Sequence, residues 1–307
     1  FWCRAGSSFE QPGEEGLAHF LEHMVFKGSE SLGAGEFDLK IESLGGSSNA
    51  ATGFDDVHFH VLVPSEVIES ALNLLTTLVL KPTLCPEAYV TEREVVLEEI
   101  AQSHDQPEEQ VFQKLLEISW GNHSYGRPIL GIEESLRNSN PNIMRSFHER
   151  LYQGQNCCLA IAGRIPENIE SLVGNTYLSK LSHNDIHKDL GNSQEIKFNR
   201  VRKVIEVPRL ESARILMSWE IPPAKEQIML MGIDISTSIF AEGRRSRLVD
   251  KLREELQIVE YIDMGITVFE QSGLVILEAY CKEEDLEEVE QQIHTLINAH
   301  RHDMRIR

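Results

Sequence analysis

Residues 16–28, GLAHFLEHMVFKG, place two histidines and a glutamate inside an otherwise apolar segment. His19 and His23 are four residues apart, so on an α-helix their imidazoles stand one turn apart on the same side. Two imidazoles in that arrangement can bind one metal ion at about 2.0–2.1 Å each. Glu22 points slightly aside, which suits a base near the metal better than a third ligand. The pattern HxxEH is known from zinc peptidases.

A helical wheel gives this segment two separate faces. One arc is apolar and contains Leu17, Phe20, Leu21, Met24 and Val25. The opposite arc contains His19, Glu22, His23 and Phe26. The pattern therefore predicts a helix over residues 14–27 that packs one face on the core. The other face carries the candidate metal ligands and base. The alternative is a chance pattern on a solvated helix face, which the motif alone leaves open.

A third ligand is needed, because zinc hydrolases usually hold the ion with three protein groups. The segment TEREVVLEEIAQ supplies two candidate carboxylates, Glu92 and Glu99, which are seven residues apart and so share one helix face. Glu98 points about 100° away from Glu99. Taken alone, these glutamates are typical of a solvated acidic helix.

Four segments together resemble the pitrilysin/insulinase family of zinc peptidases, which includes the mitochondrial processing peptidase: GLAHFLEHMVFKG, GGSSNAATGFDDVHFHVLVP, EREVVLEEI and YGRPILG. In that family the third ligand is a glutamate 76 residues after the second histidine, and 99 − 23 = 76 identifies Glu99. A second family glutamate, seven residues earlier, is Glu92. The resemblance implies one Zn²⁺ per chain, held by His19, His23 and Glu99, although these ligands also suit Mn²⁺ or Co²⁺ in vitro.

The implied activity is that of a metalloendopeptidase acting on extended or unfolded peptides. Glu22 would take a proton from the attacking water and pass it to the leaving amine, and Glu92 would orient His19 or His23. Two other interpretations remain: a noncatalytic structural subunit of the same fold in a larger complex, and a metal-binding protein without peptidase activity. The intact HxxEH motif with Glu99 favours the enzyme, since a scaffold has no need of it.

The segment SSNAAT predicts a strand of small residues, to whose edge a peptide substrate could add as a further strand. The resemblance points to Asn49, Ala50 and Thr52 as substrate contacts. A plain core strand, with small residues for packing, is the alternative.

Family members often carry an arginine and, seven residues later, a tyrosine that bind the substrate backbone. In this chain Glu260 is seven residues after Arg253, and Tyr261 is eight residues after it. Either the intervening loop absorbs the offset or the chain lacks the pair, which in some relatives comes from a noncatalytic subunit. We therefore expect a homologous second subunit or a homodimer.

The order strand, helix, helix, strand, strand, helix is expected twice along the chain. This pattern predicts an α+β fold of duplicated α/β-roll domains, like those of processing peptidases. Each domain would be an antiparallel-rich mixed sheet with helices packed on one face, and the second copy would be incomplete. The expected domains are an N-terminal catalytic zinc-binding domain (1–181), a linker (182–197) and a truncated, noncatalytic second domain (198–307).

Three of the expected strands are residues 1–8, 157–165 and 203–207, and one of the expected helices in the second copy is residues 243–256.

The composition narrows the class of partner. The 307 residues include 49 Asp and Glu against 29 Lys and Arg, and the net charge of −20 argues against nucleic acid as a partner.

No apolar run is long enough to span a bilayer. The first residue is not Met, so we treat the chain as a fragment in which a targeting segment would be out of view. A cytoplasmic location of the bacterial type is favoured.

Overall fold

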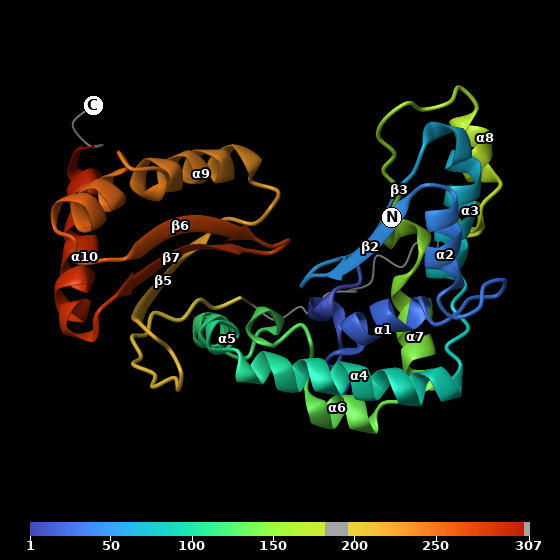
Figure 1. Cartoon of the computed structure of the whole chain (residues 1–307), viewed down its shortest axis with the longest axis horizontal. Helices are drawn as coiled ribbons and strands as arrows, with labels where there is room; N and C mark the ends of the chain where they lie inside the picture. Colours follow the sequence, from blue (N-terminus) through green and yellow to red (C-terminus); the bar gives the residue numbers. More distant parts are fainter. Residues whose placement is uncertain (182–195, 304–307) are drawn as a thin grey trace. The chain divides into compact units, whose positions relative to one another are not determined.

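The computed structural model describes the backbone of residues 1–181 and 196–303, which fold as two compact units (Figure 1). Unit 1 comprises Phe1–Gln106 and Asn122–Glu195, and unit 2 comprises Pro107–Gly121 and Ile196–Arg307. The helix that begins at Pro107 belongs to unit 2, whereas the expected second domain begins at residue 198. Most of the predicted linker 182–197 lies outside the described residues.

Unit 1 combines a small sheet with seven described helices and short 3₁₀ turns. Its strands and helices are β1 (Trp2–Cys3), α1 (Leu17–Val25), α2 (Glu36–Ser43), β2 (Ser47–Thr52), β3 (Val57–Leu62), α3 (Ile68–Leu80), α4 (Pro86–Asp105), α6 (Glu133–Asn138), α7 (Pro141–Leu151), β4 (Cys157–Cys158) and α8 (Ile169–Gly174).

The four strands of unit 1 form an antiparallel sheet in the order β2-β3-β1-β4. β2 pairs with β3 from Ser47 opposite Leu62 to Thr52 opposite Val57, and its other edge has no ladder partner in this sheet. Val57 and Phe59 of β3 are buried because side chains alternate between the two faces of a strand. Within the part of the chain that the structure describes, this edge of β2 is therefore free to accept an added strand.

α1 shows the two faces that its sequence predicts. Its apolar arc is buried, whereas His19, Glu22, His23 and Phe26 are only partly covered. α4 packs against α1, and the Phe20 ring of α1 lies 4.6 Å from the Tyr89 ring of α4 (Figure 1). The core of unit 1 thus fixes the spacing between the helix with the histidines and the helix with the glutamates.

Unit 2 repeats the predicted order of elements around a three-stranded antiparallel sheet, β5-β7-β6. α9 lies beside β6, and α10 contacts β5 (Figure 1). Its elements are α5 (Pro107–Trp120), β5 (Ala213–Ile221), α9 (Gln227–Ala241), a π-helix (Val249–Glu255), β6 (Tyr261–Val268), β7 (Gly273–Cys281) and α10 (Leu286–Asp303). The duplicated α+β fold class is confirmed, and the described ladders are all antiparallel.

Three predicted strands are shorter or missing. β1 ends at Cys3 because the chain turns back there, with the Ala5 N–H donating to the Cys3 carbonyl at 2.8 Å. β4 is confined to two residues because its ladder partner β1 is only two residues long. Residues 203–207 form no strand, and Val204 exposes 80% of its surface. An alternating pattern needs a partner strand, which these residues do not have among the described elements.

The predicted helix 243–256 is wound as a π-helix over Val249–Glu255, where the Leu256 N–H donates to the Lys251 carbonyl five residues earlier at 2.9 Å. Among the described residues, no helix combines the length and the hydrophobicity that crossing a bilayer requires.

The backbone just before α1, at Glu15 and Gly16, passes very close to the backbone at Gly131. A Cβ atom on Gly131 would lie 2.2 Å from the Gly16 Cα and 2.5 Å from the Glu15 carbonyl oxygen, and its φ is +87°. Both contacts are with backbone, so neither can move away alone.

We expect Gly131→Ala to destabilise unit 1 by about 3 kcal/mol, because the new Cβ atom would overlap the backbone of residues 15 and 16 and an alanine is strained at this φ. Gly13 is the matched control, because its φ is +90° and nothing lies within 4 Å of an added Cβ. Gly13→Ala should cost only about 1 kcal/mol. Calorimetric melting of the two variants measures the difference, and equal melting temperatures would refute the close-crossing argument.

Candidate metal centre

Three side chains from two helices converge in unit 1. The Glu99 Oε2 atom on α4 lies 3.7 Å from the His19 Nε2 atom and 3.5 Å from the His23 Nε2 atom, both on α1. The two imidazole rings meet edge to face at 4.6 Å. One donor atom from each residue lies within 4.8 Å of the other two, and no other group of three such side chains occurs in the described part of the chain.

This donor set fits a zinc ion. Ligand bonds of 2.0–2.1 Å in a tetrahedron separate neighbouring donor atoms by about 3.3 Å, and the two contacts of Glu99 are close to that value. Burial, together with the neighbouring His23, lowers the pKa of His19 to about 4, so its imidazole is neutral at pH 7. A metal-binding imidazole must be neutral. The side chains of His19 and His23 expose only 14% and 19% of their surface.

Glu92, also on α4, contacts two side chains of the segment that carries the histidines, His23 and Lys27. Its Oε1 atom lies 3.0 Å from the His23 Nδ1 atom, and its Oε2 atom lies 2.7 Å from the Lys27 ammonium. A carboxylate on the second ring nitrogen orients the imidazole and raises its basicity. Sequence reasoning missed Lys27. The available signal was its position four residues after His23, one turn further along the same side.

Glu22 is held by a residue of the neighbouring strand. The Thr52 hydroxyl of β2 donates to the Glu22 Oε2 atom at 2.5 Å. Burial raises the pKa of Glu22, and the hydrogen bond from Thr52 opposes that shift. The sequence prediction placed Thr52 against a substrate, whereas in the structure its hydroxyl bonds the expected base. No pattern in the sequence shows this contact, because it joins residues 30 positions apart.

A cavity of about 520 Å³ lies between α1, α2 and the start of β2, lined by Glu22, Phe26, Asp38, Glu42 and residues 46–50. Asn49 and Ala50, the other predicted substrate contacts, belong to this wall, and the Asn49 side chain accepts from the Ala50 N–H at 2.9 Å. The cavity thus joins the expected base to the free edge of the sheet.

The predicted pair Arg253 and Tyr261 lies in unit 2. The Arg253 guanidinium pairs with its neighbour Glu254 at 3.0 Å, and the Tyr261 ring lies 4.9 Å from the Tyr280 ring. Arg253 belongs to the π-helix, which takes one more residue per hydrogen-bonded turn than an α-helix.

Two protein-family models cover nearly the whole chain. The model described as insulinase (peptidase family M16) matches residues 1–133, and the model described as the peptidase M16 inactive domain matches residues 139–304. The histidines and glutamates of the candidate centre all fall within the first match.

Individual relatives agree with this result. An uncharacterized zinc protease of Rickettsia felis is 27% identical over 299 residues, which are 96% of this chain and 70% of that protein. The beta subunit of the mitochondrial-processing peptidase of Mus musculus is 31% identical over 167 residues, 54% of this chain and 34% of that one. The solved structure of a protease from Helicobacter pylori superposes with a TM-score of 0.83 at 22% identity, covering 95% of this chain and 73% of that one, and shows the same fold.

Removing one ligand tests the geometry of the centre. We expect Glu99→Gln to weaken zinc binding, because a neutral amide is a poor ligand. Loss of a residue that only supports a ligand costs about ten- to hundredfold in metal affinity, and loss of a ligand should cost at least as much. Glu98→Gln is the matched control, since Glu98 is exposed on the same helix, one residue away. Competition with a chromophoric chelator measures both affinities. Equal losses in the two variants would contradict the assignment of Glu99.

Proposed function

The chain belongs to the insulinase family of peptidases, family M16, and from that premise we propose that it is a zinc-dependent endopeptidase acting on extended or unfolded peptides. The observation that carries the proposal is the convergence of His19, His23 and Glu99 beside a half-buried Glu22. One Zn²⁺ per chain would be held by the two imidazoles and the Glu99 carboxylate. When bound, the ion supplies Lewis acidity, which lowers the pKa of water toward about 7 and polarises a carbonyl.

Glu22 is the residue that moves the proton. Burial raises the pKa of this carboxyl, which strengthens it as a base and lets it keep the proton taken from the attacking water. The same group then delivers that proton to the nitrogen of the leaving amine. The Thr52 hydroxyl bonds one carboxylate oxygen and leaves the other for the transfer. Glu92 keeps the His23 ring in its orientation through the Nδ1 atom.

The edge of β2 supports the choice of an extended peptide as substrate. A strand with one unpaired edge offers backbone N–H and C=O groups to an incoming chain, which pairs along it regardless of its side chains. The adjoining cavity has room for a side chain of that peptide. Asp38 and Glu42 add negative charge to its wall, so acidic side chains are disfavoured there.

Exchange of the base tests the mechanism. We expect Glu22→Gln to retain zinc but to lower kcat by about 10² to 10⁴, because an amide cannot accept the proton. The assay is hydrolysis of a quenched fluorescent peptide, with zinc content measured in parallel and a chelator added to the parental protein. Glu98→Gln serves as the matched control and should cleave like the parental chain.

The outcomes separate the alternatives. Zinc binding without chelator-sensitive hydrolysis in the parental protein would favour a metal-binding protein without peptidase activity. Neither zinc binding nor hydrolysis would favour a structural subunit of the same fold. Parental turnover in Glu22→Gln would remove Glu22 from the role of base.

We extend the proposal to a partner, either a homologous second subunit or a second copy of this chain. Arg253 and Tyr261, the residues expected to bind the substrate backbone, already contact Glu254 and Tyr280 within unit 2. We therefore expect the isolated monomer to be only weakly active and a complex to be fully active. Size-exclusion chromatography with peptidase assays on each fraction tests this, and full activity in the monomer peak would contradict it.

A further inference from the structure

The helix that carries both histidines has an unusual beginning. Its N-cap position is Gly16, in the left-handed region at φ +98°, and Gly16 has no side chain with which to bond the first amides of the helix. A Cβ atom at this position would lie 2.7 Å from the Leu130 carbonyl oxygen and 3.0 Å from the Gly131 Cα. The Ser, Asp or Asn that commonly caps a helix is therefore excluded. The amides of this buried turn need an acceptor from elsewhere in the chain.

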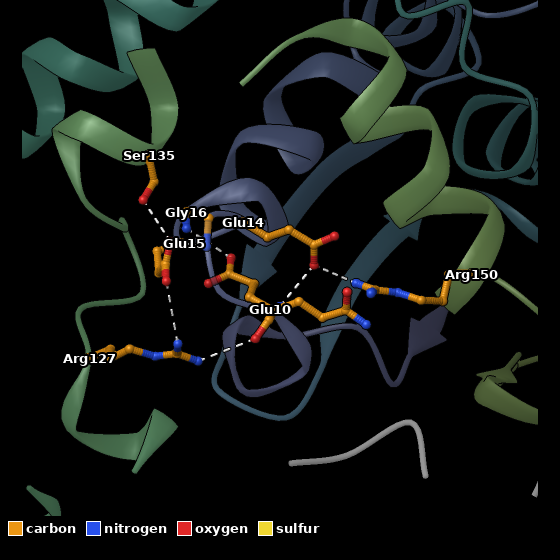
Figure 2. Close-up of polar contacts among 9 residues, drawn as sticks. Glu10, Glu14, Glu15, Gly16, Arg127, Ser135 and Arg150 are labelled. Atoms are coloured by element: carbon orange, nitrogen blue, oxygen red, sulfur yellow. Dashed lines mark hydrogen bonds and ion pairs between the residues drawn. The ribbon is translucent and has the colours of Figure 1, made fainter. Parts of the chain in front are cut away.

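Glu10 supplies that acceptor from six residues upstream. Its Oε1 atom accepts from the Gly16 N–H at 3.0 Å (Figure 2). The same atom accepts from the Ala18 N–H at 2.9 Å. The Leu17 N–H donates to the Glu14 carbonyl at 2.8 Å. The first three amides of this segment are thus all bonded, and Ala18 directly precedes the ligand His19.

The surroundings hold Glu10 in place. Glu10 as a whole exposes 7% of its surface. The Arg127 guanidinium donates to the Glu10 carbonyl oxygen at 3.5 Å and lies 3.8 Å from the Glu15 carboxylate (Figure 2). Burial raises the pKa of Glu10 to about 8, against the two amides and Arg127, which lower it. Both helix amides bond the same oxygen, so the acceptor role needs a carbonyl-type oxygen and does not need a negative charge.

The two histidines differ in what orients them. The Nδ1 atom of His23 is fixed by Glu92 at 3.0 Å. The Nδ1 atom of His19 is buried and has no hydrogen-bond partner among the described residues. No hydrogen bond at Nδ1 therefore fixes the His19 ring, and the place from which the ring reaches Glu99 is set by its backbone, in the turn that Glu10 anchors.

We propose that Glu10 is a positioning residue for the metal centre, which holds the first turn of α1 so that the His19 imidazole faces Glu99. The inference rests on the proposed metal centre of His19, His23 and Glu99. Glu10 touches neither metal nor substrate and acts through the backbone of residues 16–18.

The test compares side chains of similar length at position 10. Glu10→Met fills the space without an acceptor, whereas Glu10→Gln retains a carbonyl oxygen. We expect the Met variant to bind zinc about ten- to hundredfold more weakly, and the Gln variant to bind nearly as tightly as the parental chain. The absorption spectrum of the Co²⁺-loaded protein should change in the same order, because it reports the geometry of the ligands. Neither readout requires peptidase activity.

Glu14→Met is the matched control. Glu14 lies in the same cluster and pairs with Arg150 at 2.5 Å, but its side chain bonds no amide of α1 (Figure 2). Its zinc affinity and Co²⁺ spectrum should stay at the parental values. If Glu10→Met does not fold, Glu10→Asp, which is one methylene too short to reach both amides, replaces it.

Two outcomes would overturn this inference while leaving the metal centre intact. In the first, Glu10→Met, or Glu10→Asp in its place, keeps the zinc affinity and the Co²⁺ spectrum of the parental chain. In the second, Glu14→Met loses as much zinc affinity as the position-10 variant. A parental protein that binds no zinc or Co²⁺ would instead overturn the metal centre on which the inference rests.

Discussion

The packing of α1 against α4 is the constraint on which the candidate centre depends. Burying an aromatic or large aliphatic side chain stabilises a protein by about 1.5–3 kcal/mol, and α1 buries several of them. The side chains of His19, His23 and Glu92 are largely removed from water, and the cost of desolvating paired groups offsets much of their attraction. The contacts of the carboxylates with the imidazoles therefore do not by themselves position the helices. The apolar face sets the distance between α1 and α4. The seven-residue spacing of Glu92 and Glu99 then brings both carboxylates to the side of α4 that meets the histidines.

Burial acts in one direction on the groups at this centre, because it disfavours the charged form of each. It lowers the pKa of His19, which keeps the imidazole free to bind a metal, and it raises the pKa of Glu22, which strengthens the base. Glu92 keeps two positively charged or hydrogen-bonding partners, His23 and Lys27, which compensate its burial. The same half-buried environment thus favours a neutral imidazole at His19 and a more basic carboxylate at Glu22.

Much of the centre could be predicted from the sequence, because periodicity carries information about single helices. The two faces of α1 and the shared face of Glu92 and Glu99 follow from 3.6 residues per turn, and the spacing typical of a known family joined the two helices. Contacts that depend on tertiary packing could not be predicted. The hydroxyl of Thr52 on Glu22 and the glycine crossing at Gly131 join distant segments and leave no periodic signal.

The errors in the predicted fold have a related origin. The pattern at residues 203–207 alternates like a strand, but a strand exists only where a neighbour completes its ladder. β4 is limited in the same way, since its ladder partner β1 is only two residues long. The π-winding of Val249–Glu255 also has no signal in the sequence, because Val249, Leu252 and Leu256 follow the i, i+3, i+7 spacing that predicts an α-helix.

Unit 2 provides an internal comparison for the role of the polar face of α1. α9 follows the first strand of unit 2 as α1 follows that of unit 1, and it lies beside the sheet with an apolar outer face that includes Ile228, Met231 and Ile235. A helix at this place in the fold therefore has no structural need for histidines or a glutamate. Half-burying three titratable groups costs free energy unless they are paired. In α1 that cost is offset by contacts with Glu92, Glu99 and Thr52, which are the contacts that define the candidate centre.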